Sequence, residues 1–428
     1  MSKLFFANFV NELMTTVPGP GHARNLTAGA IRKIWLAEPG DLLVLPRPMD
    51  PEFFEYACDV LRLEPRLVEI VSPSGGVLEY LAQRLRQDEV AMRHMRAWVR
   101  EHPGSEAVLF AQDRPSIALF AELGLGIQGY ADPHRNELVD LIYHMNTKDG
   151  FRNVARDLGI PIPAGARCQS IEALVDHAQR LAEETGRVIV KFNRGSNGYG
   201  NHTLERDQLQ GRDAAERVAA FIRTNWAEQP TDFVVETYYE HSICPSVELR
   251  VEASGPQELY ACDQRSVNNA WRGTVTPPQS MDAATRQSLS TYGARFGAHV
   301  WAAGYRGICD VDFLLTSAGK LLATETNFRR TGGTYLETLV RRLTKNFPEE
   351  RVWLADNGIT AGVADFRQAL LALHDSGLQY DAERGTGCIL TANTLPTDRR
   401  LRYLVIGKDF DSVCAWETEL RSRFALEA

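Results

Sequence analysis

Asp310-Val-Asp-Phe-Leu-Leu315, Thr316-Ser-Ala-Gly-Lys320 and Leu321-Leu-Ala-Thr-Glu-Thr-Asn-Phe-Arg329 follow one another without a break in the chain. The two outer runs are short and rich in apolar or β-branched residues, which is typical of strands, and the middle run has turn chemistry. We therefore predict an antiparallel hairpin. A two-residue loop at Ala318-Gly319 would place Asp312 opposite Glu325.

The hairpin predicts a patch of oxygen ligands on one face of its sheet. Side chains alternate along a strand, so Asp310 shares a face with Asp312, and Glu325 shares a face with Asn327. Adjacent carboxylates repel one another, and a hard cation such as Mg²⁺ removes that conflict while leaving room for phosphate oxygens. Arg329 then suits a phosphate or acyl-phosphate oxygen. Taken alone, the same pattern also fits an exposed acidic hairpin.

Length and composition limit the class of protein. The 428 residues are too many for one core and predict several domains. A hydrophobic content of 44% and a charged content of 24% are those of an ordinary globular protein. The net charge of −8 argues against nucleic acid or an anionic membrane as the main partner. The seven cysteines include no CxxC pair, so we expect reduced thiols in a cytoplasmic protein.

Short apolar runs alternate with helical patterns in the first third of the chain, which predicts a small, mostly parallel α/β layer. The expected strands cover residues 4–10, 41–46, 68–71 and 108–110, and the expected helices cover 25–35 and 79–98. The Pro/Gly stretch at 16–22 is expected to be a plain connection rather than part of a cleft. Gly124, Gly126 and Gly129 have the spacing of a dinucleotide loop, but Pro133 opposes the helix that such a loop must open, so nicotinamide binding is not expected.

A strand that ends near a lysine precedes a glycine-rich loop. Arg187–Phe192 has the pattern of a strand, and the loop Asn193–Asn201 follows it directly. The loop glycines leave the backbone free to approach phosphate oxygens, with Lys191 as a point charge. The order differs from a P-loop, in which the lysine follows the glycines. A flexible hairpin tip is the alternative.

Three more charged residues lie on predicted strands. Glu236 stands near the end of the run Phe233–Tyr239, where it could accept a hydrogen bond from the amino group of an adenine. An exposed glutamate at a strand end explains it equally well. Glu248 and Arg265 are candidate site residues, although a cross-strand ion pair accounts for them almost as well.

The order of these pieces, from about residue 146 to 340, resembles the ATP-grasp superfamily of carboxylate–amine or carboxylate–thiol ligases. The resemblance implies ATP between two α+β subdomains. It assigns Lys148, Lys191, Gly195, Ser196, Gly198, Glu236 and Glu248 to the nucleotide site, Asp312, Glu325 and Asn327 to two Mg²⁺ ions, and Arg329 with Arg265 to the acyl phosphate and the oxyanion. Many family members carry a glutamate for the ribose in an E-x-S-V-E-like run. Here that run reads Cys244-Pro-Ser-Val-Glu248, which leaves the ribose contact open.

The flanking regions extend the resemblance. Residues 1–145 resemble a pre-ATP-grasp domain, and the stretches 380–390 and 402–407 resemble the C-terminal domain of the pheganomycin-type peptide ligases. The predicted fold class is α/β and α+β, an ATP-grasp fold with an N-terminal α/β layer and a small C-terminal α+β domain. The expected division is 1–145, 146–240 with the glycine-rich loop, 241–345 with the hairpin, and 346–428.

The resemblance implies an ADP-forming ligase that activates an amino-acid-like carboxylate as an acyl phosphate and couples it to an amine, in natural-product biosynthesis. A carrier-protein thiol is the alternative acceptor, and a phosphotransferase or a nucleotide-binding protein without ligase activity are the alternative functions. The expected cofactors are ATP and Mg²⁺. The expected partners are a small-molecule donor and an amine or carrier-protein acceptor, with no nucleic acid and no membrane, and with room for a homodimer.

Overall fold

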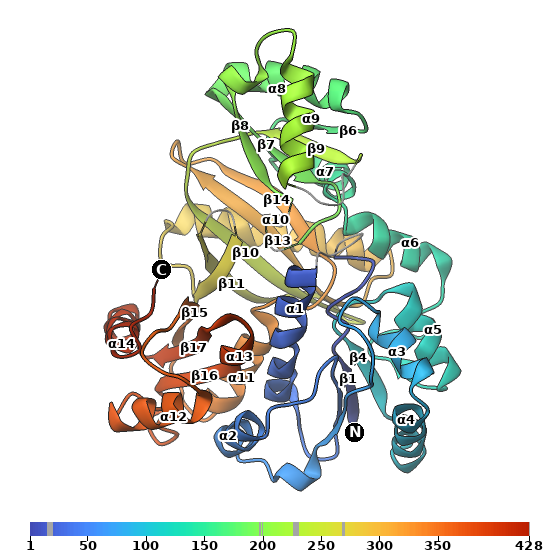
Figure 1. Cartoon of the computed structure of the whole chain (residues 1–428), viewed down its shortest axis with the longest axis vertical. Helices are drawn as coiled ribbons and strands as arrows, with labels where there is room; N and C mark the ends of the chain where they lie inside the picture. The colour runs from blue at the N-terminus through green and yellow to red at the C-terminus, as the bar shows by residue number, and fades with distance from the viewer. Residues whose placement is uncertain (15–19, 197, 199, 226–230, 268–269, 428) are drawn as a thin grey trace.

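The computed structural model describes residues 1–14, 20–196, 198, 200–225, 231–267 and 270–427. Three sheets organise these residues, with five, four and eight strands. Figure 1 shows the four-stranded sheet at the top, the eight-stranded sheet across the middle and lower left, and the N-terminal layer at the lower right. The connection predicted at 16–22 falls largely on residues 15–19, which lie outside the described residues.

The N-terminal layer is the parallel α/β unit that the sequence predicts, with strand order β3-β2-β1-β4-β5. Its strands are β1 (Lys3–Phe6), β2 (Leu42–Val44), β3 (Glu69–Val71), β4 (Glu106–Leu109) and β5 (Gly126–Ile127). Its helices are α1 (Pro20–Ala28), the 3-10 helices η1 (Gly29–Leu36) and η2 (Pro65–Leu67), α2 (Pro51–Leu61), α3 (Leu81–Gln87), α4 (Glu89–Glu101), α5 (Arg114–Glu122) and α6 (Asn136–Met145).

The single helix predicted over 79–98 is wrong, because two helices occupy this stretch. Asp88 ends α3 and caps α4, and its carboxylate accepts from the backbone N–H groups of Val90 and Ala91. An N-cap side chain competes with the continuing helix for these donors, so the chain bends at Asp88.

The four-stranded sheet is antiparallel, with order β6-β9-β7-β8. Its elements are α7 (Lys148–Asp157), β6 (Gly165–Cys168), α8 (Ile171–Thr185), β7 (Arg187–Phe192), β8 (His202–Glu205), the 3-10 helix η3 (Arg206–Leu209), α9 (Ala214–Asn225) and β9 (Phe233–Thr237). Ile189 of β7 pairs with Glu236 of β9, and Lys191 pairs with Val234. Because alternate residues share a face, this register puts the Lys191 and Glu236 side chains on the same side of the sheet.

The eight-stranded sheet has the order β14-β13-β10-β11-β12-β15-β17-β16. Its first part comprises β10 (His241–Glu252), β11 (Gly255–Val267), β12 (Ala270–Thr276), α10 (Ala283–Ala302), β13 (Gly307–Thr316), β14 (Leu321–Asn327) and α11 (Thr334–Thr344). Its second part comprises β15 (Val352–Ile359), α12 (Phe366–Asp375), β16 (Gly387–Asn393), α13 (Leu395–Asp398), β17 (Arg400–Gly407) and α14 (Phe410–Arg423). The antiparallel pairing of β12 with β15 joins the two parts into one sheet.

The hairpin β13–β14 has the predicted pairing of Asp312 with Glu325, but it reaches that pairing by a different route. The loop is wider than two residues, because Leu315 pairs with Leu321 and Thr316 donates its N–H to the Lys320 carbonyl at 2.9 Å. A bulge at Thr324 then shifts the register between Asp312 and Phe313 by one residue. The wider loop and the bulge cancel, so the acidic side chains meet as the strand pattern predicts.

Trp35 connects the N-terminal layer to the C-terminal strands. The side chain is fully buried and packs edge-on against the rings of Phe53 and Tyr56, at centroid distances of 5.9 and 6.4 Å. Its indole Nε1 donates to the carbonyl of Thr391 in β16 at 2.8 Å. A tryptophan that combines a large buried surface with a satisfied N–H is an efficient link between layers.

We expect Trp35→Ala to lower the free energy of unfolding by about 3–5 kcal/mol, because it leaves a cavity and an unpaired carbonyl. The change should appear as a lower denaturation midpoint in urea, followed by tryptophan fluorescence or circular dichroism. Trp301→Ala is the matched control, because Trp301 is 37% exposed. Equal losses in the two variants would contradict the role assigned to Trp35.

Candidate active site

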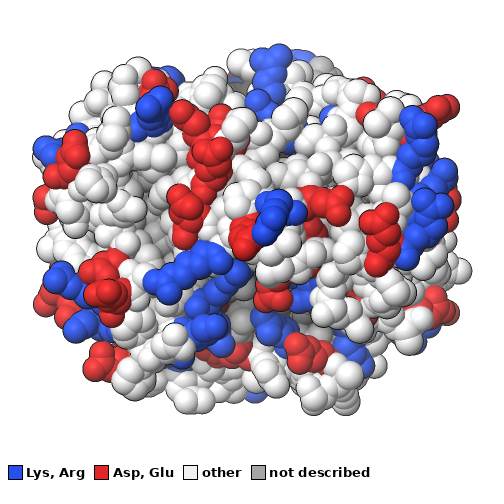
Figure 2. Space-filling view, turned by 90° about the horizontal axis from the view of Figure 1, so that it is seen from below, with Lys and Arg blue, Asp and Glu red and all other residues white. Residues whose placement is uncertain are grey.

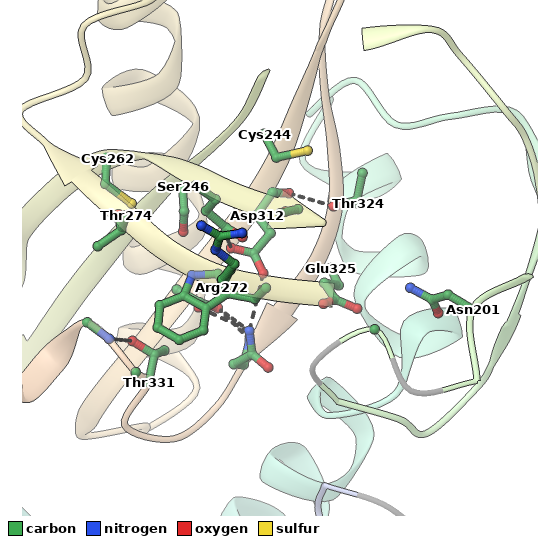
Figure 3. Close-up of a pocket in the computed structure, with 18 of the residues that line it drawn as sticks. Asn201, Cys244, Ser246, Cys262, Arg272, Thr274, Asp312, Thr324, Glu325 and Thr331 are labelled. Carbon is green, nitrogen blue, oxygen red and sulfur yellow. Dashed lines mark hydrogen bonds between the residues drawn. The ribbon is translucent and has the colours of Figure 1, made fainter. Parts of the chain in front are cut away.

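Oxygen-bearing side chains of the hairpin converge on one patch. Asp312 stands opposite Glu325, and Asp310 stands opposite Asn327. The Asn327 amide Nδ2 donates to both carboxylate oxygens of Asp310 at 3.0 Å and to Asp312 Oδ2 at 3.4 Å. Figure 3 shows Asp312 and Glu325 on neighbouring strands with their carboxylates turned into the pocket. The face predicted from strand alternation is therefore formed.

The electrostatics of this patch call for a cation. Burial and the Glu248 carboxylate raise the pKa of Asp310 to about 7. Burial together with the charges of Asp310 and Glu325 raises the pKa of Asp312 well above its usual range. Burial also acts to raise the pKa of Glu325, but the attraction of Lys148 and Lys191 outweighs it and lowers that pKa. Excess buried negative charge among carboxylate and amide oxygens fits a hard cation such as Mg²⁺.

Among the described residues, no three His, Cys, Asp or Glu side chains come together as a preformed metal cluster. This agrees with the chemistry of Mg²⁺, which is usually held by one or two carboxylates together with water and substrate phosphates rather than by a complete protein cage. The donor set of Asp312, Glu325 and Asn327 fits such a site. The number of ions stays a prediction.

Two lysines face the hairpin. Lys148, the first residue of α7, places its ammonium Nζ 3.0 Å from Glu325 Oε2 and 3.2 Å from the carbonyl of Gly195. Lys191 Nζ lies 2.6 Å from Glu236 Oε2. Both lysines are buried, so their charges act through a medium of low dielectric, where attraction for phosphate oxygens is strong. Their predicted contacts with the phosphates remain predictions.

Glu236 is the centre of a buried ion network. Its carboxylate contacts the guanidinium of Arg152 and the ammonium of Lys191, and only 1% of the residue is exposed. A buried carboxylate between two cations is a stable arrangement because each charge is paired. The structure thus gives Glu236 a role in positioning Lys191. The adenine contact stays a prediction, supported by the presence of Glu236 in the cavity wall.

The glycine-rich loop closes one side of the site. Gly198 has a φ of +75° and lines the cavity, and residues 197 and 199 lie outside the described residues. A Cβ at Gly200 would lie 2.4 Å from the ring of Phe192, so only glycine fits there. The Ser196 hydroxyl and the Asn201 Oδ1 are buried without a partner among the described residues. Figure 3 shows Asn201 across the pocket from Glu325, and Ser196 lies in the adjoining small pocket with Lys148 and Glu325.

The two predicted catalytic arginines occupy different places. Arg329 lies within the patch, where its guanidinium donates to Asn327 Oδ1 at 2.5 Å. Arg265 is not brought to the patch. It pairs with Asp356 Oδ2 at 2.9 Å and with Glu417 Oε1 at 2.5 Å, both from the C-terminal part of the chain. Arg265 is therefore ion-paired, as the alternative interpretation expected, but its partners lie far along the sequence and not on an adjacent strand.

Glu248 lies just behind the cavity wall. Its carboxylate is buried and accepts from the hydroxyls of Tyr260, at 3.3 Å, and Thr331, both of which line the cavity. Burial raises the pKa of Glu248 to about 7. Its predicted contact with the nucleotide stays a prediction, and the observed contacts connect it to the part of the cavity beyond the hairpin.

One cavity of about 770 Å³ joins these parts and contains residues that the sequence analysis missed. The missed lining residues come from η1, the glycine loop, β11, β12, the β14–α11 turn and β17, and they are Arg32, Asn201, Tyr260, Gln264, Arg272, Thr331, Arg400 and Arg402. Gln264 Nε2 donates to Asp312 Oδ1 at 2.5 Å, although 48 residues separate the two in sequence. No local pattern marks such residues, because only the sheet order brings them together.

Comparison with solved structures relates this architecture to known proteins. N5-carboxyaminoimidazole ribonucleotide synthetase from Thermus thermophilus has a TM-score of 0.59 and 13% identity, and the match covers 100% of this chain and 99% of that one. Biotin carboxylase from Campylobacter jejuni, solved with a β,γ-ATP ligand, has a TM-score of 0.60 and 12% identity, covering 100% and 92%. Residues 30–125 match the family model "Pre ATP-grasp domain". The chain has the ATP-grasp fold and is similar to ATP-grasp enzymes.

Other matches cover the C-terminal region and the chain as a whole. Residues 368–420 match the model "PGM1 C-terminal domain". The L-propargylglycine–L-glutamate ligase of Streptantibioticus cattleyicolor is 25% identical over 395 residues, which cover 83% of this chain and 80% of that protein. The [butirosin acyl-carrier protein]–L-glutamate ligase of Niallia circulans is 25% identical over 237 residues, 53% of each. The predicted fold and the predicted resemblance are therefore confirmed.

Three further observations bear on the other expectations. Within the described part of the chain, every helix is too short or too polar to cross a bilayer. All seven cysteines are free, as predicted. Figure 2 shows acidic and basic side chains interspersed over the lower face of the molecule, with no broad basic surface on that face.

We expect Glu325→Ala to reduce turnover by about 10³-fold or more, because it removes preorganised charge where phosphoryl transfer needs it. Steady-state ADP release would measure the loss. Glu183→Ala, which removes a largely exposed ion-paired carboxylate on α8, is the control and should leave the rate unchanged. A Glu325→Ala enzyme with near-normal turnover would refute the metal assignment.

We expect Lys191→Ala to raise the KM for ATP or to slow phosphoryl transfer by about 10- to 100-fold, the usual effect of losing a charge-assisted contact. Kinetics at varied ATP concentration would separate the two effects. Lys320→Ala, in the exposed hairpin turn, is the matched control. Unchanged kinetics in the Lys191 variant would remove this lysine from the site.

Proposed function

We propose that the chain is an ADP-forming ligase that converts an amino-acid-like carboxylate into an acyl phosphate and then couples it to an amine. The single observation that supports this most strongly is the cavity itself. The hairpin patch and Lys191 lie at one part of it, and about 770 Å³ of continuous space extends from there to β12 and β17. A nucleotide alone does not need that second region, whereas an acyl donor and an acceptor do.

The proposed chemistry has two steps. A carboxylate oxygen of the donor attacks the γ-phosphorus of ATP, the bond to the β-phosphate oxygen breaks, and ADP leaves. The acceptor amine then attacks the acyl carbon and loses a proton, and inorganic phosphate leaves as the amide forms. Mg²⁺ held by Asp312, Glu325 and Asn327 would neutralise phosphate charge. Lys148 and Lys191 would hold the phosphates, and Arg329 would bind the developing oxyanion.

Burial of the site protects the reactive acyl group. Lys148, Lys191 and Asp310 are each at most 6% exposed. A dry site strengthens the attraction between these charges and the phosphates and keeps water from hydrolysing the acyl phosphate. We propose domain boundaries at about residues 145, 240 and 345. The nucleotide would lie between the four-stranded sheet and the hairpin.

The relatives favour an amino acid as substrate. Both curated relatives are named as ligases of L-glutamate, one joining it with L-propargylglycine and the other with an acyl-carrier protein. We infer an amino-acid-like donor with an amine acceptor, by analogy with the relative that matches over most of this chain. A carrier-protein thioester is the second candidate, supported by the name of the relative matched over 53% of this chain.

The nucleotide product tests the proposed reaction. We expect ³¹P NMR of the protein with Mg-ATP, the common L-amino acids and hydroxylamine to show ADP and phosphate, with a hydroxamate detected in parallel. When hydroxylamine is omitted, ADP should form only if one of the supplied amino acids is a suitable acceptor amine.

AMP and pyrophosphate would instead establish adenylation and would overturn the proposal. A stable phosphorylated product that forms without any acceptor would favour a phosphotransferase. The Glu325→Ala protein is the negative control for contaminating ATPases.

A further inference from the structure

The part of the cavity beyond the hairpin is lined by guanidinium groups. Arg32 lies on η1, Arg272 lies on β12, and Arg400 and Arg402 lie on β17. These elements come from the first, middle and last parts of the chain. Asp398 is the one carboxylate among the described lining residues of β12, α13, β17 and η1, so this wall of the cavity carries a positive balance.

Two of the four arginines are already neutralised. The guanidinium of Arg272 pairs with Asp356, Nε to Oδ1, at 2.6 Å. Arg402 pairs with Asp398, Nη2 to Oδ2, at 2.6 Å. These pairs hold their guanidiniums in fixed positions at the wall and add little net charge to it.

The other two have only neutral partners among the described residues. Arg400 Nη1 donates to the side-chain oxygen of Asn357 at 2.7 Å. Arg32 donates from Nε to the Gly29 carbonyl at 2.9 Å and from Nη1 to the Tyr335 hydroxyl at 2.8 Å. Each guanidinium has five N–H donors, so both keep donors for a further acceptor.

The arginines of this wall act on one another. Burial and the charge of Arg32, among its neighbours, act to lower the pKa of Arg402. Helix α1, which leads into η1, also packs against α13, which leads into β17. Holding like charges together in a partly buried cavity costs free energy that a bound anion recovers.

The geometry points to a carboxylate-binding subsite formed by Arg32 and Arg400, with Arg272 and Arg402 beside them. A guanidinium matches a carboxylate with two parallel hydrogen bonds, so this wall suits a planar carboxylate. The reacting carboxylate belongs at Arg329 and the hairpin, so the arginine wall takes a second, non-reacting one. This inference rests on the proposed function only for the place of the reacting group.

The second carboxylate has two sources with the same chemistry. It belongs either to a donor with two carboxylates, such as an acidic amino acid, or to an acceptor amino acid or peptide, whose amine reacts while its own carboxylate is held at the wall. In both cases Arg400 binds the carboxylate. The cases differ in whether the donor or the acceptor needs Arg400 for binding.

Binding measured by calorimetry tests the subsite without turnover. The protein in Mg-ADP would be titrated with the common L-amino acids and with glycyl dipeptides, and each ligand that binds would be compared with its C-terminal amide. We expect Arg400→Gln or Arg32→Gln to lower the affinity for the carboxylate ligand by about 10- to 100-fold. The amide should bind the wild type about as weakly as the carboxylate binds these variants.

Mg-ADP affinity should be unchanged in both variants, which shows that the nucleotide site is folded. Arg384→Gln, at a side chain that is 80% exposed, is the matched control and should bind every probe like the wild type. Arg400→Lys should recover part of the affinity, because it keeps the charge but not the paired donors.

Kinetics in the same variants identify the source. A raised KM for the donor alone indicates a donor with two carboxylates, and a raised KM for the acceptor alone indicates the carboxylate of the acceptor. Equal affinity of the amide and the carboxylate, or an Arg400→Gln protein that binds like the wild type, would overturn the subsite, as would the failure of every carboxylate probe to bind.

Failure of the subsite and failure of the proposed reaction give different results. Arg400-dependent binding without ADP formation would support the subsite and reject the ligase chemistry. ADP formation that is unchanged in the Arg32 and Arg400 variants would support the ligase chemistry and reject the subsite.

Discussion

Electrostatic repulsion between carboxylates on adjacent strands is the constraint on which the centre of this molecule depends. Asp310, Asp312 and Glu325 lie on two paired strands, and burial raises the pKa of the first two. The protein itself supplies part of the compensation, through Lys148 at Glu325 and through the amide of Asn327. A bound metal–nucleotide complex would offset the repulsion that remains, so its binding would be coupled to the relief of that repulsion.

The surrounding structure controls how the cations reach that patch. Lys191 is held by Glu236, which Arg152 holds in turn, so one buried network sets the position of a lysine that would otherwise have several rotamers. Burying a charged network is stable only when each member is paired. Preorganisation of this kind reduces the reorganisation that phosphoryl transfer would otherwise require.

Features that depend on local contacts could be predicted from the sequence. Alternation along β13 and β14 predicts which side chains share a face, and the pairing of Asp312 with Glu325 follows from it, although the bulge at Thr324 is not visible in the sequence. Long-range contacts could not be predicted. Arg265 is paired by Glu417, 152 residues away, and no periodicity in either segment indicates that contact. The far wall of the cavity illustrates the same limit, because Arg32 and Arg400 gain their places only when the first and last parts of the chain pack together, a packing that the Trp35 indole helps to fix through the Thr391 carbonyl.

The continuous eight-stranded sheet also sets a distance. The hairpin lies at β13–β14 and Arg400 lies on β17, with β10, β11, β12 and β15 between them in unbroken pairing. Adjacent strands are spaced by about 4.8 Å, so the separation between the two ends of the cavity is set by the count of strands and the curl of the sheet. Loop insertions leave that separation unchanged. With the number of strands and the curl of the sheet unchanged, the lengths of the side chains at the wall set how long a molecule fits between the two ends.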